Sequence, residues 1–184
     1  MNPLMVNPRL VFDRRRPMDF VIDVVGNCNL RCPSCPVGNM GAINPNGLLD
    51  VELFKKLMAK GAKDYNISHV ELYNWAEPFL HPELPKLIQI VKSYDLPCWL
   101  SSNLNVIRNV EEALRANPDF LRISLSGFTQ PVYEEGHAKG NVERVKANMR
   151  LLSEARRKVG NCTTNIQVFY HKYKYNLHEV EPMR

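Results

Sequence analysis

The sequence predicts an α/β fold in which helices cover a parallel β-sheet. Apolar runs typical of buried strands recur along the chain, and the segments between them carry apolar residues at three- and four-residue spacing, as amphipathic helices do. Strand and helix alternate at least four times. Parallel strands need long crossover connections, which helices normally supply. The predicted strands are Phe20 to Val25, His69 to Tyr73, Cys98 to Leu100, Leu121 to Leu125 and Ile166 to Tyr170.

The predicted helices follow from the same periodicity. Their crossovers are expected to be right-handed. In folds of this kind functional side chains collect at the carboxyl ends of the strands, so the loops after the first four predicted strands are expected to face one shared cavity. The helices are assigned to Val51 to Asp64, Glu83 to Tyr94, Val110 to Ala116 and Val142 to Val159.

Length and composition indicate one compact domain. The chain has 184 residues, of which 45% are hydrophobic, which is enough for one sizeable core and too little for two ordinary domains. Residues 1–17, which include the basic run Arg14 to Arg16, are interpreted as a solvated N-terminal arm. Residues 18–184 form the predicted core domain.

Charge and hydropathy narrow the classes of partner. The net charge is +5, but the basic residues are scattered rather than gathered into a stripe, so nucleic acid is not an expected partner. No stretch approaches the roughly 18 uninterrupted apolar residues that span a bilayer, and the N-terminal residues lack the apolar region of a secretion signal. We therefore expect a cytoplasmic protein without a membrane partner.

Three of the five cysteines, Cys28, Cys32 and Cys35, lie close together in a long loop between Gly26 and Gly47. Loops of this length are usually functional. Five cysteines cannot all pair with one another, and this clustering suits metal binding in a reducing compartment better than a disulfide framework. The sequence therefore predicts a thiolate metal centre in this loop.

The missing fourth ligand favours an iron–sulfur cluster over zinc. Thiolates suit both, but a zinc site needs a fourth ligand, and the closest histidines in sequence, His69 and His81, belong to other elements. A cluster held by three thiolates keeps one iron open for another ligand. A zinc site completed by a distant residue remains as an alternative, as do three unrelated thiols.

The spacing of Cys28, Cys32 and Cys35 after the first strand resembles the signature of the radical SAM superfamily. The resemblance implies a partial (βα)₆ barrel of parallel strands and a 4Fe-4S cluster held by these three cysteines. It also implies that the open iron binds the amino and carboxylate groups of S-adenosylmethionine, whose reductive cleavage gives a 5′-deoxyadenosyl radical that abstracts hydrogen from a substrate. Ser34 stands where the family often has an aromatic residue near the adenine.

The segment Asn74 to Pro82 resembles the Gly-Gly-Glu-Pro segment of the family, with Trp75 and Ala76 in place of the glycines and Glu77 retained. The resemblance implies that Glu77 meets the ammonium group of the cofactor. Taken alone, a Glu-Pro pair is equally typical of entry into a helix. The longer segment Leu72 to Pro82 most closely resembles the branch of the family whose members often carry a C-terminal SPASM extension.

Two further strand ends match the family pattern. Ser101, Ser102 and Asn103 correspond to its ribose-binding segment, although a capped turn is an alternative reading of these residues. Ser124 and Ser126 lie in a segment that resembles Ser-Leu-Asp-Gly, with Ser126 in place of the acid, and both are implied as cofactor contacts. Strand alternation places both serines on the same face.

The segment His137 to Arg144 resembles the basic segment with which the family enters a helix. The resemblance implies that Lys139 or Arg144 neutralises the cofactor carboxylate. For either residue a solvated surface charge is the alternative.

Four other residues of metal-ligating type are assigned structural roles. Cys98 lies in an apolar strand and Cys162 just ahead of one, so both are expected to be buried small hydrophobes. His171 and His178 flank a stretch rich in Lys and Tyr that can meet a substrate, but helix-entry and surface roles are favoured for them.

The motifs occur in the family's order from Asp19 to about Glu181, which predicts a radical SAM enzyme, an oxidoreductase or a transferase. The resemblance implies an electron donor such as flavodoxin or ferredoxin and a substrate, whether peptide, sugar or nucleoside, that the sequence does not name. The alternative is a non-catalytic iron–sulfur or zinc-binding module that retains the fold.

The barrel is expected to be incomplete on its C-terminal side, because about five of six strands are recognisable. The strand from Ile166 to Tyr170 is then the exposed edge of the sheet, and an uncovered edge invites self-association or a partner.

Overall fold

The computed structural model describes residues 15–39 and 46–183. Residues 1–14 of the predicted N-terminal arm and residues 40–45 of the cysteine loop therefore lie outside the described part. In chain order the elements are β1 (Met18–Val21), α1 (Pro36–Asn39), α2 (Val51–Asp64), β2 (Ile67–Glu71), η2 (Pro78–Leu80), α3 (Leu84–Lys92), β3 (Cys98–Ser102), α4 (Val110–Arg115), β4 (Phe120–Ser124), α5 (Gln130–Gly136), α6 (Val142–Val159), β5 (Asn165–Phe169) and η3 (Lys174–Glu179).

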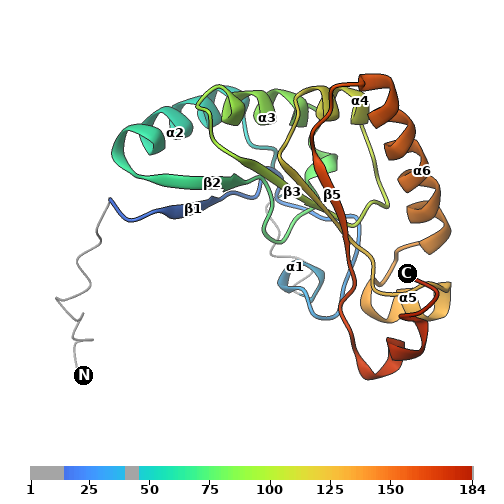
Figure 1. Cartoon of the computed structure of the whole chain (residues 1–184). Coiled ribbons are helices and arrows are strands. Elements are labelled where there is room, and N and C mark those ends of the chain that lie inside the picture. Colours follow the sequence, from blue (N-terminus) through green and yellow to red (C-terminus); the bar gives the residue numbers. More distant parts are fainter. Residues whose placement is uncertain (1–14, 40–45, 184) are drawn as a thin grey trace, which may run out of the picture.

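Five parallel strands form one sheet in the order β1-β2-β3-β4-β5. Each strand pairs with the next strand in sequence, which is the arrangement of strands around a β/α barrel. The helices α2, α3, α4 and α6 lie along one face of the sheet, whereas α1 and α5 lie near one end of it (Figure 1). The predicted α/β fold with about five parallel strands is confirmed.

The core lies between the sheet and the helices on this face. Alternate residues of β4 and its following loop, Leu121, Ile123 and Leu125, are buried toward the helices. Helix α2 buries Phe54 and Met58, which are four residues apart and lie on one side of the helix. Burying an apolar side chain of this size contributes roughly 1.5–3 kcal/mol, so this layer holds the strands in place.

Polar side chains fix where the two longest helices begin. The Asp50 carboxylate accepts a hydrogen bond from the Leu53 N–H (2.8 Å) at the start of α2, and the Asn141 amide oxygen accepts one from the Arg144 N–H (2.8 Å) at the start of α6. Both helices have the predicted bounds. In the described part of the chain no helix is both long and apolar enough to cross a bilayer.

The first strand is shorter than its apolar pattern predicts. β1 ends at Val21, although apolar residues continue to Val25. The later residues pair with the segment before α2 instead, because the Leu49 N–H donates to the Val24 carbonyl (2.9 Å) and Val25 forms an antiparallel bridge with Leu48. Val24 and Val25 are buried, as the apolar pattern predicts, but they pair with the segment before α2 and do not extend β1.

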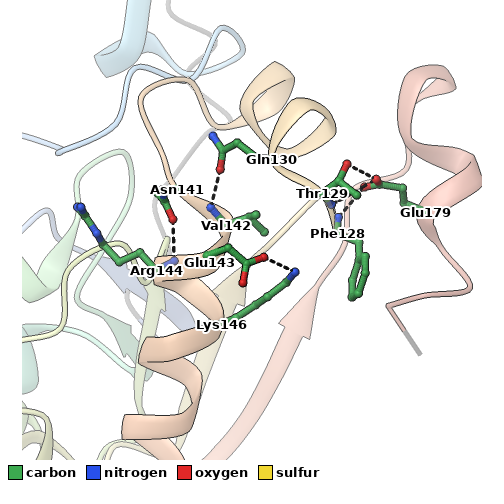
Figure 2. Close-up of polar contacts among 9 residues, drawn as sticks. All are labelled: Phe128, Thr129, Gln130, Asn141, Val142, Glu143, Arg144, Lys146 and Glu179. Atoms are coloured by element: carbon green, nitrogen blue, oxygen red, sulfur yellow. Dashed lines mark hydrogen bonds and ion pairs between the residues drawn. The ribbon is translucent and has the colours of Figure 1, made fainter.

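Helices α1 and α5 and the 3₁₀ helices η2 and η3 were not among the predicted helices. Glu179 of η3 caps the start of α5, because its carboxylate accepts hydrogen bonds from the N–H groups of Phe128 (2.6 Å) and Thr129 (3.2 Å) (Figure 2). The capping group is 50 residues away in sequence. The local sequence therefore does not predict where this helix begins.

Strand β5 lies at one end of the sheet, as predicted, and β1 lies at the other. Val168 of β5 points to the helix-covered face, since it is paired in register with Ile123, yet its side chain remains 41% exposed. The apolar surface that the sequence predicted at this edge is therefore present. Self-association at the edge stays a prediction.

Gly127 follows β4 and lies against the backbone of α5. A Cβ atom at this position would meet the Tyr133 Cα and N atoms at 2.5 Å. We expect Gly127→Ala to lower the free energy of unfolding by about 2 kcal/mol or more, because two backbone segments must separate. Gly160→Ala is the control: its φ is 74° but nothing lies within 4 Å, so only the backbone cost of about 1 kcal/mol applies. Denaturant unfolding measures both, and equal losses would contradict the close packing.

Candidate active site

A cavity of about 340 Å³, the strand-end cavity, lies where the strands end. Its walls come from the loops after β1, β2, β3 and β4, from α5 and from the segment after β5. The predicted convergence of the first four loops on one cavity is therefore confirmed. Nine residues proposed from the sequence line it: Cys28, Cys32, Cys35, Glu77, Ser101, Ser102, Asn103, Ser124 and Ser126.

Hydrogen bonds join the two ends of the cysteine loop, and others form within the loop. The Gly26 N–H donates to the Gly47 carbonyl (2.8 Å), which joins the two ends of the loop. The Arg31 guanidinium donates to the carbonyls of Cys28 and Leu30 (both 2.7 Å), and the Arg31 N–H donates to the Ala138 carbonyl (2.9 Å). Arg31 therefore shapes the cysteine loop and ties it to the segment after α5.

The three clustered thiols meet different neighbours. The Cys28 Sγ accepts from the Leu30 N–H (3.5 Å) and from the Asn103 amide (3.6 Å). The Cys32 Sγ lies 3.9 Å from the His137 Nδ1, and the Cys35 thiol donates to the Trp75 carbonyl (3.8 Å). All five cysteines are free.

Burial disfavours the thiolate forms of two of these cysteines. It raises the pKa of Cys28 to about 12 and that of Cys32 to about 11. Nearby acidic groups add to the effect, including Glu77 for Cys28 and Cys35 for Cys32. A cationic metal centre between the thiols would offset this cost, since thiolates are the form that binds metal.

The described residues offer no site for a single metal ion at the three thiols. Among the described residues, no group of three or more His, Cys, Asp or Glu side chains is placed to hold one metal ion. The zinc alternative therefore has no ready-made single-ion site within that part of the chain. Three separate thiols on one cavity wall remain compatible with a larger cluster.

The Glu77 carboxylate is almost fully buried and joins the loops after β2 and β3. Its oxygens accept hydrogen bonds from the Ser102 hydroxyl (2.9 Å), the Asn103 N–H (2.8 Å) and the Phe79 N–H (3.1 Å). Burial raises the pKa of Glu77 to about 7, and these three hydrogen bonds oppose the rise. Glu77 therefore organises the loop that carries the predicted ribose contacts, in addition to lining the cavity.

Asp23 was not recognised from the sequence, yet it shapes the next part of the wall. Its carboxylate accepts hydrogen bonds from the backbone N–H groups of Asn74 (2.8 Å), Trp75 (3.0 Å) and Ala76 (3.0 Å). These N–H groups are therefore engaged by Asp23, while the Trp75 carbonyl accepts a hydrogen bond from the Cys35 thiol. An isolated acid after the first strand offers no signal of this role.

The serines at the end of β4 differ in their surroundings. Ser126 is buried: its hydroxyl accepts a hydrogen bond from the His171 N–H (3.1 Å), and its own N–H donates to the His137 Nε2 (3.3 Å). Ser124 is half-buried on the same cavity wall, as strand alternation predicted. Burial lowers the pKa of His137 to about 4, so this imidazole is neutral at ordinary pH.

Lys139 and Arg144 are exposed, and neither lines the strand-end cavity. Figure 2 shows Arg144 in the first turn of α6 with its side chain extended from the helix. The member of this segment that reaches the cavity wall is His137, and the cation on the wall is Arg122 of β4. The carboxylate role that the resemblance gives Lys139 or Arg144 remains a prediction.

Sequence reasoning missed several wall residues. Arg122 lies two and four residues before Ser124 and Ser126, so the alternation that grouped the serines also predicts its face. His171 is exposed, as expected, but it also lines the cavity together with Tyr173, whereas the exposed His178 does not. Asn176, which is fully buried, positions this segment, because its amide donates to the carbonyls of Ser126 (3.0 Å) and His171 (2.8 Å).

The two remaining cysteines lie away from this cavity. Cys98 is fully buried in the sheet, as expected. Cys162 packs against the core but is only partly buried, and its thiol donates to the Thr164 hydroxyl (3.2 Å), so it is less buried than expected. It precedes the edge strand β5, where the sheet gives less cover.

Comparison with known proteins decides the family. The sequence profile of the radical SAM superfamily matches residues 22–177, which contain the cysteine loop and all the strand ends described above. The chain belongs to the radical SAM superfamily. Members of this superfamily are enzymes that cleave S-adenosylmethionine with an iron–sulfur cluster.

This radical SAM chain is also similar to GTP 3′,8-cyclase of Chlorobaculum tepidum. The two are 29% identical over 143 residues, which cover 75% of this chain and 42% of the cyclase. The chain thus spans less than half the length of that relative.

Solved structures share the fold. SuiB of Streptococcus suis bound to S-adenosylmethionine matches with a TM-score of 0.69 at 15% identity, over 90% of this chain and 37% of SuiB. BtrN in complex with AdoMet and 2-DOIA matches with a TM-score of 0.60 at 14% identity, over 85% of this chain and 58% of BtrN. These matches confirm the partial-barrel fold and do not single out the SPASM-like branch, which remains a prediction.

Replacing Glu77 with Gln is expected to change how stability depends on pH. Between pH 4.5, the ordinary pKa of a Glu, and about pH 7, folded Glu77 keeps a proton that the unfolded chain has lost. The free energy of unfolding therefore falls as pH rises through this window, by at most about 1.4 kcal/mol per pH unit. Glu77→Gln lacks this contribution, so the stability difference between wild type and variant should decline over the same window.

Denaturant unfolding of the cluster-free protein at several pH values measures this difference. Glu52→Gln, on the exposed side of α2, is the matched control and should follow the wild-type profile. Parallel profiles for wild type and Glu77→Gln would mean that Glu77 keeps its ordinary pKa.

Proposed function

We propose that this chain is the catalytic core of a radical SAM enzyme that binds a 4Fe-4S cluster through Cys28, Cys32 and Cys35 and S-adenosylmethionine beside it. The observation that carries the proposal is the convergence of the three thiols and four strand-end loops on one cavity. Cluster and cofactor must be in contact for electron transfer, and a shared cavity provides that contact. When bound, the cluster supplies the electron for reductive cleavage of S-adenosylmethionine to a 5′-deoxyadenosyl radical.

The surroundings of the thiols support a cluster. Hydrogen bonds to cluster sulfurs tune the reduction potential, and Cys28 accepts two from neutral N–H donors. His137, neutral at ordinary pH, lies beside Cys32 without adding charge. Soft ligands with neutral donors around them fit an iron–sulfur centre better than a hard cation.

The cavity wall also supports S-adenosylmethionine binding. The side chains of Ser101, Ser124 and Asn103 supply hydroxyl and amide groups of the kind that bind sugar hydroxyls and a carboxylate. Ser34 cannot cover the adenine as an aromatic residue would, but Trp75 lines the same cavity and is 48% exposed. We assign the adenine contact to Trp75, which occupies one of the family's glycine positions.

The cellular setting, the electron donor and the substrate class are part of the same proposal. We propose a cytoplasmic, reducing setting, because a thiolate cluster is unstable to oxidation, and an electron donor such as flavodoxin or ferredoxin. The substrate, whether peptide, sugar or nucleoside, and the SPASM-like branch belong to the same proposal. The non-catalytic alternative is favoured by one feature, the replacement of the two glycines by Trp75 and Ala76.

Iron binding tests the ligand set. We expect anaerobically reconstituted wild-type protein to bind about four irons per chain and to show the broad visible absorption of thiolate-bound iron–sulfur clusters. Replacing Cys28, Cys32 and Cys35 together with Ala should abolish iron binding. Cys98→Ala, which removes a buried thiol away from the cavity, should leave it intact. Equal loss in both variants, or zinc as the only bound metal, would contradict the assignment.

Cofactor cleavage tests the enzyme itself. The reduced, reconstituted wild-type protein should convert S-adenosylmethionine to 5′-deoxyadenosine and methionine, and the triple cysteine variant should not. Glu77→Gln should retain the cluster and bind S-adenosylmethionine more weakly, because the buried carboxylate that holds Ser102 and Asn103 is lost. Liquid chromatography of the products and a binding titration measure the two effects. A stable cluster with no 5′-deoxyadenosine would favour the non-catalytic module.

A further inference from the structure

A second cavity of about 560 Å³, the inner-face cavity, lies on the sheet face opposite to the main helices. It shares two wall residues, Tyr73 and Arg122, with the strand-end cavity. The two cavities therefore adjoin along the inner face of the partial barrel. None of the predicted cofactor contacts or cluster ligands lines the second one.

Aromatic side chains form a row along this face. Trp99 stacks on His69 with ring centres 3.9 Å apart, Phe120 lies 5.6 Å from Trp99, and Phe169 lies 6.1 Å from Phe120. The row runs from β2 through β3 and β4 to β5, and Trp99, Phe120 and Phe169 line the inner-face cavity. Such a surface binds flat apolar groups through their faces and edges.

Arg122 stands at the boundary between the two cavities. Its guanidinium carbon lies 5.1 Å from the ring centre of Tyr73 and 5.2 Å from that of Phe169, which is cation–π distance for both. Its Nε–H donates to the Ser101 hydroxyl (3.0 Å). A guanidinium group is planar and has five N–H donors. In Arg122 the neutral Ser101 hydroxyl uses one of these five.

The acids of the same cavity are engaged elsewhere. The Glu71 carboxylate lies 3.1 Å from the His69 Nε2 and accepts the Tyr73 hydroxyl, and the Asp119 carboxylate accepts from the Lys92 ammonium (2.6 Å) and the Cys98 N–H (2.8 Å). Within the described residues, no carboxylate lies at ion-pair distance from Arg122. A half-buried cation with unused donors therefore faces a cavity with an apolar aromatic wall.

We propose that the inner-face cavity is the substrate site of this chain and that it selects a substrate bearing an oxyanion, either carboxylate or phosphate, which Arg122 binds. The planar fork of Arg122 matches two oxygens of such a group, and the rings of Tyr73 and Phe169 hold the fork in place. The remainder of the substrate lies on the aromatic row. That the bound molecule is a substrate rests on the proposed function. Oxyanion binding itself is testable without any radical chemistry.

The experiment uses isothermal titration calorimetry on the full chain, both with a reconstituted cluster and without one. The probes are benzoate and phenyl phosphate, which join a ring to a carboxylate or a phosphate, and benzamide, a neutral molecule of similar shape. We expect one or both anions to bind and benzamide to bind at least tenfold more weakly. Whichever anion binds more tightly identifies the source of the oxyanion.

Variants locate the binding. Arg122→Gln keeps a donor for Ser101 but removes the charge, and should weaken anion binding about tenfold or more; Arg122→Lys should give an intermediate loss, because charge remains and the fork does not. Trp99→Leu, on the aromatic row, should also weaken binding. Arg150→Gln removes the same charge from an exposed site on α6 and should leave binding unchanged. Circular dichroism of each variant checks that it is folded.

A competition measurement separates the substrate from the cofactor. In the reconstituted protein the anionic probe should bind equally well in the presence of saturating S-adenosylmethionine. Displacement of the probe by S-adenosylmethionine would overturn the proposal and assign Arg122 to the cofactor carboxylate. Equal probe affinity in wild type and Arg122→Gln, or no binding of either anion, would also overturn it. Failure to form 5′-deoxyadenosine, in contrast, would overturn only the proposed function.

Discussion

Side-chain carboxylates that accept backbone N–H groups hold together the loops at the carboxyl ends of the strands. Asp23 gathers three consecutive N–H groups of the loop after β2, Glu77 joins that loop to the one after β3, and Glu179 caps α5 from the far end of the chain. Hydrogen bonds to charged groups contribute about 1.5–3 kcal/mol each. Because every one of these carboxylates connects separate segments, the shape of the strand-end cavity depends on them.

Burial of acidic groups in these loops disfavours their ionised forms. Glu77 is buried near the Cys28 thiol, and burial raises the pKa values of Glu77, Cys28 and Cys32. A cation bound beside these groups, whether a metal centre or an ammonium or sulfonium group, would favour their ionised forms and offset the cost of burial. Arg122 has the opposite sign and lies where the strand-end cavity meets the inner-face cavity. The two cavities therefore offer complementary electrostatics along one continuous surface.

The fold was largely predictable because it depends on local periodicity. Helices α2 and α6 have caps and apolar spacing that lie within their own segments, and their bounds agree with the prediction. Strand β1 is shorter than predicted, because Val24 and Val25 pair with the segment before α2. Helix α5 was missed, because the carboxylate that caps it belongs to Glu179. In both cases the deciding partner is remote in sequence.

The sequence by itself determined the family, the three clustered cysteines and the strand ends that meet at one cavity. Cysteine spacing and strand-end position are properties of the chain order, and parallel topology converts that order into proximity. Only the tertiary structure decided which side chain of the segment after α5 faces the cavity: His137 lines it, whereas Lys139 and Arg144 are exposed. The physical reason is that a side chain's direction at a loop depends on which remote backbone and carboxylate groups satisfy the loop's hydrogen bonds, and no local pattern encodes those partners.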